Sequence, residues 1–249
     1  YLTGNPQITF FKVVYRRHTN FSMESIHQTW NGDETGTNQR CTAVISRNGD
    51  LLYRMYLDVT GHVENTPTPA EYKPNLGSKF IKQLELEIGG QRIDRHSGKW
   101  MEIYSELTQY NPTGLRGQLG YNEDGGEFGY KKDLGRGTLF QISTGMGGFS
   151  NTRNTGVAAQ TPFVYYRIPL QFWFCRNPGL ALPLIALQYH EVKVILDHNI
   201  GGNLPPTAGG TTVNPTSQLW CDYIYLDTDE RRRFAQVSHE YLIEQIQEQ

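Results

Sequence analysis

Histidine followed directly by glutamate occurs twice in the chain, at His190-Glu191 and His239-Glu240. This pair begins the helical motif of zinc proteases, in which a second histidine four residues after the first supplies a second zinc ligand. The corresponding positions here hold Val194 and Ile243, and His190 falls in a strand-like run. The sequence therefore predicts polar or half-buried strand residues here rather than a metal site.

Two further patterns could support chemistry. Asp227-Thr228-Asp229 could offer two carboxylates to a divalent cation, but we expect Asp227 to end a strand and Asp229 to cap a helix. Gly145-Met146-Gly147-Gly148 resembles a dinucleotide-binding loop, but its third glycine position holds Ser150, so a flexible loop is expected. Phosphate-loop and nucleophile-elbow motifs do not occur. We therefore expect no catalytic, cofactor-binding or metal-binding residues, and no enzyme.

Basic residues cluster at Arg16-Arg17-His18 and at Arg231-Arg232-Arg233. Each cluster has too few charges to bind a phosphate backbone stably. The whole chain has 23 Lys and Arg against 25 Asp and Glu, a net charge of -2, which argues against direct nucleic-acid binding. We expect both clusters to form salt bridges within the chain or between subunits, because the planar guanidinium group suits such interfaces.

Length and composition argue against several other classes of protein. The chain has 249 residues, which is enough for one large domain with a buried core. It holds no apolar run of the roughly 18 residues that a membrane-spanning helix needs. The first residues, Tyr1 to Gly4, have neither an initiator Met nor a signal-peptide pattern, so we expect a fragment or a processed product. The three cysteines are odd in number and widely spaced, which is typical of free thiols in a reducing compartment.

Alternating apolar and polar residues predict that strands dominate the fold. In Leu51–Val59, for example, every second residue is apolar and is expected to share one buried face. Pro169 lies inside one such run and predicts an edge strand or a bulge. The other predicted strands are Ile8–Tyr15, Phe21–Trp30, Cys41–Arg47, Phe80–Ile88, Thr138–Ser143, Phe163–Phe174, Leu187–Asp197 and Leu219–Asp227.

Helical patterns are few. Ser97 is a plausible cap for a helix reaching Tyr110, whose buried face should hold Trp100, Ile103, Tyr104 and Leu107. A second helix is expected to be capped by Thr228 or Asp229, and Tyr241–Gln247 fits either a helix or a strand. Long loops rich in Gly, Pro or Asn are expected at His62–Lys79, Asn111–Gly137, Ser143–Thr161 and Gly201–Ser217. The pattern predicts an all-β antiparallel sandwich with a few short helices and long loops.

Aromatic residues are expected on both faces of some strands, as with Tyr53 and Tyr56, or Tyr165 and Tyr166. Strands that are apolar on both faces need cover from loops, helices or another subunit, and Tyr, Trp and Arg are favoured at interfaces. The residues alone thus predict a β-sandwich that self-associates and has no catalytic centre.

Four stretches of the chain together resemble the major capsid protein of nucleocytoplasmic large DNA viruses. They occur in the order that this family requires and extend from one end of the chain to the other. The stretches are Gly4–Phe21, Leu182–Val192, Asp222–Ala235 and His239–Gln245.

The resemblance implies a jelly roll, in full-length members two in tandem. Residues 1–227 would form the first jelly roll, and residues 228–249 would form a helical or extended connection to a second, absent from this chain. The resemblance also implies homotrimers of pseudo-hexagonal outline that tile an icosahedral shell. Expected partners are neighbouring capsomers, penton and minor capsid proteins and a nearby internal membrane. Expected locations are the virion capsid and, for assembly, the host cytoplasm. The loops His62–Lys79 and Asn111–Thr161 would form an outward-facing crown.

Two other readings of the fold remain open. Jelly rolls also occur in lectins, so a carbohydrate-binding module could stack sugars on exposed Trp30 or Trp100. We expect Trp100 to be buried in its helix face and Trp30 to end a strand, which disfavours this reading. A cupin-like metalloenzyme would need a cluster of His and carboxylate ligands, and the spacing in the sequence offers none.

Overall fold

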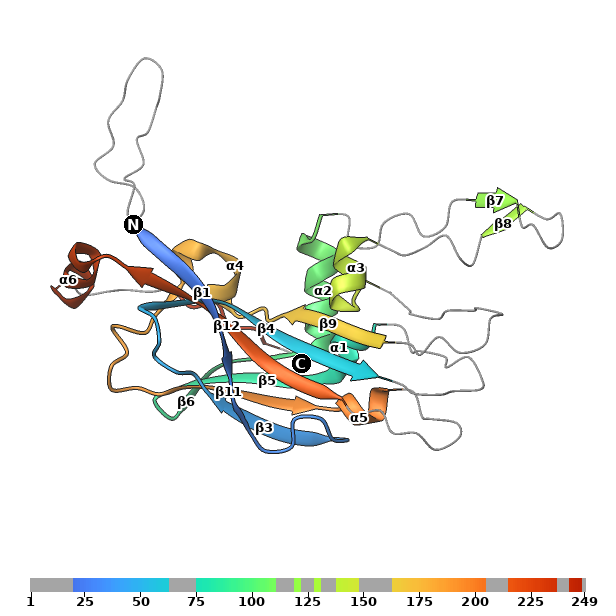
Figure 1. Ribbon diagram of the computed structural model, residues 1–249, viewed down its shortest axis with the longest axis horizontal. Helices are drawn as coiled ribbons and strands as arrows, with labels where there is room; N and C mark the ends of the chain where they lie inside the picture. Colours follow the sequence, from blue (N-terminus) through green and yellow to red (C-terminus); the bar gives the residue numbers. More distant parts are fainter. Residues whose placement is uncertain are drawn as a thin grey trace, which may run out of the picture.

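Two antiparallel sheets face each other in the computed structural model of the chain (Figure 1). The structure describes residues 20–62, 75–110, 119–121, 128–130, 138–147, 163–204, 215–236 and 242–247. The first sheet runs in the order β1 (Phe21–Gln28), β12 (Thr216–Leu226) and β4 (Leu51–His62). On its other side β4 pairs with two strands, β10 (Leu182–Pro183) and β9 (Phe163–Pro169). The second sheet runs in the order β2 (Trp30–Asn31), β3 (Gln39–Val44), β11 (Val192–His198), β5 (Ile81–Ile88) and β6 (Gln91–Ser97).

The strand pairs are nested along the sequence. β1 pairs with β12, β3 with β11, β4 with β9 and β5 with β6, all antiparallel. The chain therefore follows the path of one long antiparallel hairpin. Two further pairs, β4 with β12 and β5 with β11, fold that hairpin into two sheets. This is a jelly roll, and the predicted all-β antiparallel class is confirmed. A separate hairpin joins β7 (Leu119–Tyr121) to β8 (Phe128–Tyr130).

The core lies between the inner faces of the two sheets. In β5, Leu84 and Leu86 are buried while the alternate residue Glu85 faces outward and is paired with Arg40 and Arg92, as the alternation predicts. Full burial of one such leucine contributes about 1.5–3 kcal/mol. Further core residues from both sheets are Met55, Leu57, Val59, Ile168, Val194, Leu196, Leu219, Cys221 and Tyr223.

One predicted face is wrong in part, because β4 and β12 shift register between Cys221 and Tyr223. Such a bulge moves side chains to the opposite face of a strand. Leu52 therefore enters the main core, whereas Tyr53 packs with Leu51 and Ile224 in a second, smaller apolar cluster. Period-two alternation could not detect the extra residue.

One predicted strand and the end of another are helical. Thr138–Ser143 forms α3 (Leu139–Thr144), which starts with a reciprocal capping box: Thr138 Oγ1 accepts from the Gln141 N–H at 3.2 Å, and Gln141 Oε1 accepts from the Thr138 N–H at 2.9 Å. In the predicted strand Phe163–Phe174, β9 ends at Pro169 and α4 (Trp173–Arg176) follows. Pro169 does lie on an edge strand, because β9 pairs only with β4.

Helix α2 (Gly98–Thr108) begins where predicted, since Ser97 Oγ accepts a hydrogen bond from the Trp100 N–H at 3.1 Å. Its predicted buried face is wrong: Gly98, Met101 and Ser105 are the buried residues. Gly98 lets the start of α2 lie against the carbonyl oxygens of Ser78 in α1 (Leu76–Phe80) and Ile81 in β5, on the same side as the buried Met101 and Ser105.

The remaining helices are short. They are α1 (Leu76–Phe80), the 3₁₀ turn η1 (Pro178–Leu180), α5 (Ile200–Asn203) and α6 (Thr228–Gln236). The cap of α6 is Asp227, whose Oδ1 accepts from the Asp229 N–H at 2.6 Å, so the prediction that Asp229 is the cap is wrong. Residues 242–247 are neither helix nor strand. The predicted strand Ile8–Tyr15 and most of the predicted loops lie outside the described residues.

The close approach at Gly98 yields a stability prediction. A Cβ at this position would lie 2.0 Å from the Ser78 carbonyl oxygen and 2.3 Å from that of Ile81. Gly98→Ala should therefore lower the free energy of unfolding by about 1–3 kcal/mol or more. The matched control is Gly179→Ala, where the nearest atom is 3.3 Å away in a flexible side chain. Equal urea-denaturation midpoints for the two variants would contradict this packing.

Candidate assembly surface

The structure does not gather the residues that suggested chemistry. His190 lies exposed in the turn before β11 rather than in a strand, and His239-Glu240 lies outside the described residues. Asp227 caps α6, and Gly145 ends α3 in the left-handed conformation rather than belonging to a flexible loop. Within the described ranges, no group of three or more His, Cys, Asp and Glu side chains could hold a metal ion.

The basic cluster at the start of α6 is held by salt bridges, as predicted. Arg231 Nε lies 2.9 Å from Asp50 Oδ2, and that carboxylate also accepts the Leu226 N–H at 2.7 Å. Arg233 pairs within the helix with Glu230 at 3.3 Å. The cluster thus fastens α6 to the end of the first sheet. The other basic cluster, Arg16-Arg17-His18, lies outside the described residues.

The three cysteines are buried free thiols. Burial raises the pKa of the Cys41 and Cys175 thiols to about 12, and it raises the pKa of Cys221 well above its usual value. Only the thiolate is a good nucleophile or metal ligand. These side chains therefore act as small core residues.

His96 of β6 is fully enclosed in the core. Its ring packs edge-on against Phe172 with the centroids 4.7 Å apart, and neither ring nitrogen has a hydrogen-bond partner among the described residues. Burial, assisted by the nearby Arg176 charge, lowers the pKa of His96 to about 3. A neutral histidine with no access to solvent cannot serve a substrate as general acid or base, so its role is packing.

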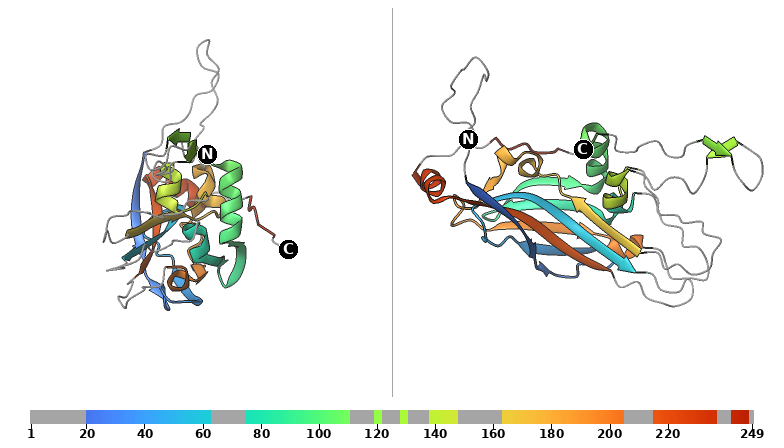
Figure 2. Two further views of the ribbon diagram at one scale, coloured as in Figure 1. Left: turned by 90° about the vertical axis from the view of Figure 1, so that its right-hand side faces the viewer. Right: turned by 45° about the horizontal axis from the view of Figure 1, so that its top comes forward.

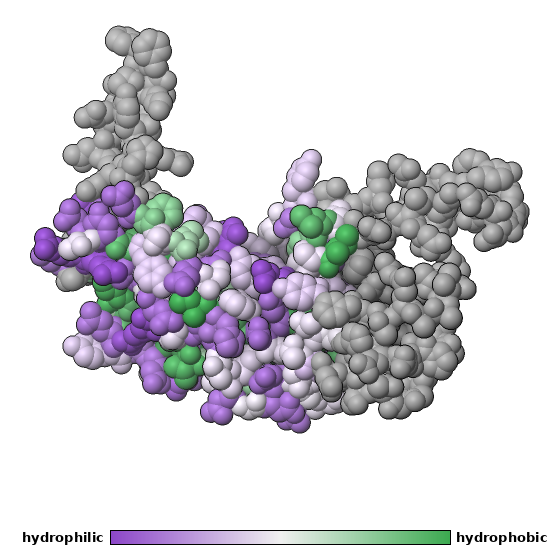
Figure 3. Space-filling view, viewed as in Figure 1, coloured by the Kyte–Doolittle hydropathy of each residue, from purple (hydrophilic) through white to green (hydrophobic). Residues whose placement is uncertain are grey.

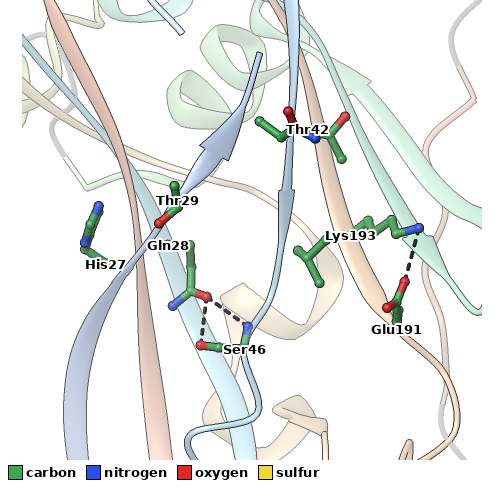
Figure 4. A pocket seen from close by; sticks show the side chains of 9 residues that line it. His27, Gln28, Thr29, Thr42, Ser46, Glu191 and Lys193 are labelled. Carbon is green, nitrogen blue, oxygen red and sulfur yellow. Dashed lines mark hydrogen bonds and ion pairs between the residues drawn. The ribbon is translucent and has the colours of Figure 1, made fainter. Parts of the chain in front are cut away.

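A polar groove of about 660 Å³ opens where the chain passes from the first sheet to the second (Figure 4). The buried Gln28 side chain lies in its wall and accepts hydrogen bonds from the Ser46 N–H at 2.9 Å and the Ser46 hydroxyl at 2.8 Å. At its other side Lys193 pairs with Glu191 at 3.2 Å. The two Gln28–Ser46 bonds tie the end of β1 to the residues that follow β3. The full lining is His27, Gln28, Thr29, Asn31, Thr42, Val44, Ser46, Glu191 and Lys193.

Neither tryptophan considered for sugar stacking is exposed. Trp30 is buried in β2, and Trp100 is half-buried at the start of α2 with its indole nitrogen enclosed. The structure therefore gives no support to a sugar platform at either residue.

Apolar side chains are exposed in separate places on an otherwise polar surface (Figure 3). On the edge strand β1, Phe21 and Met23 are 59% and 49% exposed. On α2, Ile103 and Leu107 are 46% and 75% exposed, and α3 adds Leu139. One of the hydrophobic patches in Figure 3 lies over the end that bears α2 and α3. Sequence reasoning missed these surfaces because an apolar helix face is read by default as buried.

The fold and its surface define a class of protein. The class is that of jelly rolls with surface for association: the three thiols and His96 are buried, Arg231 is paired with Asp50, and apolar side chains are exposed on the surface. None of the helices in the described ranges is both long and apolar enough to cross a membrane.

Comparison with known proteins agrees with this class. A family profile described as "Major capsid protein N-terminus" matches residues 9–227. The major capsid protein of Pyramimonas orientalis virus is 50% identical over 99% of this chain and 55% of its own length. That of Paramecium bursaria Chlorella virus 1 is 42% identical over 99% of this chain and 49% of its own length. A quasi-atomic model of the PBCV-1 capsid superposes with a TM-score of 0.64 and 37% identity, covering 96% of this chain and 50% of that one.

The chain belongs to the major capsid protein family of nucleocytoplasmic large DNA viruses. It spans about half the length of the curated relatives it matches. These relatives are named as structural proteins of the capsid, which agrees with the prediction that the chain is not an enzyme.

The buried histidine gives a pH prediction. The pKa of His96 is about 3 in the folded chain and about 6.5 in the unfolded chain, so between these values the unfolded state binds more protons. The histidine therefore costs the fold stability as the pH falls from about 6.5 toward 3. His96→Leu should remove this loss, so that its free energy of unfolding falls less than the wild-type value between pH 7 and pH 4, by about 2–3 kcal/mol.

The control variant is His190→Leu, which changes an exposed histidine and should keep the wild-type acid sensitivity. Chemical denaturation at each pH measures the difference. Parallel stability curves for His96→Leu and wild type would mean that His96 is not enclosed in solution.

Proposed function

We propose that the chain is the N-terminal jelly roll of a structural subunit of an icosahedral virus capsid. The observation that carries this proposal is the agreement of a nested jelly-roll topology with family membership over residues 9–227. Its work is geometric: the packed sheets supply a rigid body of fixed shape, and the surface supplies contacts.

The subunit is proposed to contain two jelly rolls in tandem. Residues 1–227 form the first, and residues 228–249 lead to the second, through α6 and the extended residues 242–247. The length of the relatives, about twice that of this chain, supports a second domain of similar size.

Three such subunits form a capsomer. Three chains with two similar jelly rolls each would present six similar bodies around one axis, which gives the trimer a pseudo-hexagonal outline suited to tiling a shell. The exposed apolar residues of β1 and α2 supply surface for such contacts. Neighbouring capsomers, penton and minor capsid proteins are the proposed partners, with an internal membrane nearby. A net charge of -2 fits an outer shell that does not bind the genome directly.

The proposed location is the virion capsid, with assembly in the host cytoplasm, where the buried free thiols suit a reducing environment. The loops between 62 and 79 and between 111 and 161 are proposed to face outward as the crown. Most of their residues lie outside the described ranges.

The capsomer proposal predicts the mass of the full-length protein in solution. Multi-angle light scattering should give three times the chain mass, unchanged on tenfold dilution, because capsomer interfaces are expected to exceed the roughly 1,000 Å² that marks a stable contact. A strictly monomeric profile at all concentrations would contradict the proposal.

A further inference from the structure

The first sheet ends at β1, which has a neighbouring strand on one side only among the described residues (Figure 2). β1 has eight residues and pairs with β12, so the backbone N–H and C=O groups on its other side have no backbone partner in the described ranges. Such an open edge is a template for another strand, and proteins usually protect it with proline, lysine or a bulge. β1 has none of these, and its one charged residue is Glu24.

The other edges of the two sheets are short or covered. β2 and β10 have two residues each, and β9 contains Pro169 and contacts α3. β6 is bordered by residues 242–247, since the Gln245 side-chain amide donates to the Ile93 carbonyl oxygen at 2.6 Å. In the described part of the chain, β1 is therefore the one long edge without cover.

One face of β1 carries apolar side chains out to this edge. Phe21 and Met23 lie opposite Leu226 and Ile224 of β12, which belong to the smaller apolar cluster. The cluster thus continues onto β1, but there Phe21 is 59% exposed and Met23 is 49% exposed. A further strand beside β1 would cover these two side chains.

The other face of β1 is also incomplete. Ile26 packs against the main core but is only partly buried. Glu24 is exposed, and its Oε2 accepts a hydrogen bond from the Tyr225 hydroxyl at 3.1 Å. This face therefore offers an apolar contact and a negative charge to a neighbouring strand.

The chain directly before β1 has the composition of such a strand. Ile8–Tyr15, which lies outside the described residues, is rich in aromatic and β-branched residues and is predicted to be a strand. The family profile begins at residue 9, so this stretch belongs to the matched domain. Five residues, Arg16–Asn20, join it to β1. Hairpin loops of about two to five residues are common, so the stretch can fold back onto the open edge.

We propose that Ile8–Tyr15 forms an antiparallel hairpin with β1 and closes the edge of the first sheet. A five-residue loop places Tyr15 opposite Phe21 and Lys12 opposite Glu24. A strand tethered so close meets the edge at a high effective concentration, whereas a strand of a second copy must reach it from solution. The closed edge cannot pair with the sheet of another copy, so contacts between subunits are left to side-chain surfaces.

Apolar side chains meet on both faces in this register. Directly opposite residues of an antiparallel pair share a face and contact each other, and aromatic and β-branched pairs are the favourable ones. One face then covers the exposed apolar residues of β1, and the other adds an aromatic ring beside the main core. The pairs are Tyr15–Phe21, Val13–Met23 and Phe10–Ile26.

The charges support the same register. Lys12 is the one charged residue of Ile8–Tyr15, and it lies opposite Glu24, the one charged residue of β1. Opposite charges in facing positions stabilise a strand pair. A slip of one residue would place Lys12 opposite Met23 or Ser25 and would move every side chain of the added strand to the other face.

Disulfide formation in the full-length chain tests the pairing and its register. The double variant Val13→Cys/Met23→Cys places two thiols opposite each other, and the matched control Val13→Cys/Glu24→Cys moves the second thiol to the opposite face. The three native thiols are buried and remain in place. The folded proteins are oxidised with glutathione disulfide, and the yield of each new disulfide is measured by mass spectrometry of unreduced peptides. The variant Tyr15→Cys/Phe21→Cys tests the same register at a second pair.

The expected result is a disulfide within one chain for both facing pairs, at a yield at least severalfold above that of the control. Equal yields from the facing pairs and the control would overturn the hairpin. Co-expressed single variants Val13→Cys and Met23→Cys should form no disulfide with each other, and a disulfide between them would assign the open edge to another copy. The thermal midpoints of the reduced variants, compared with that of the unmodified chain, show that the variants are folded.

The hairpin lies within one chain, so its test is independent of the capsomer proposal. A monomeric mass in light scattering would contradict the capsomer and leave the expected disulfides unchanged. Absence of the disulfides in a trimeric protein would contradict the hairpin alone.

Discussion

The packing of the two sheets against each other is the constraint on which the rest of the structure depends. The nested pairs place β1 at the edge of the first sheet beside β12, and the core lies between that sheet and the second. Leu84 and Leu86 from one sheet and Leu57 and Leu219 from the other are almost completely buried in the core that results. Everything that faces outward, including α2, α6 and the segment 242–247, is positioned by attachment to this frame.

Much of the frame could be predicted from the sequence. Alternation located β4, β5, β11 and β12, because a strand with one buried face leaves a period of two in its residues. Local sequence patterns predicted the structure less well where contacts between distant parts of the chain determine it. The bulge opposite Tyr223 moved Tyr53 to the other face, and a capping box at Thr138 turned a short apolar run into a helix. The close approach of Gly98 to two carbonyl oxygens at the start of α2 is a tertiary contact that no periodicity reveals.

Several described groups that could react are used for packing or are paired. His96 lies against Phe172, Cys175 is enclosed in the core, and Asp50 holds Arg231 at the start of α6. The prediction of salt bridges for that arginine cluster was correct because the acidic residues were available nearby. The apolar face of α2 was identified correctly as apolar but assigned to the wrong environment. Hydropathy predicts that an apolar face is buried, but it does not predict whether the same domain or another one buries it.

The role proposed for the chain rests on its shape, so the most direct test is to see that shape in an assembled shell. An electron cryomicroscopy map of particles formed by the full-length protein would resolve the number and orientation of jelly rolls in each capsomer. The expected map has six jelly-roll densities around each three-fold axis, three of which fit the two sheets of this structure with the side that bears α2 against a neighbouring density. Capsomers built from any other number of jelly rolls, or densities that the two sheets do not fit, would contradict the role proposed for this chain.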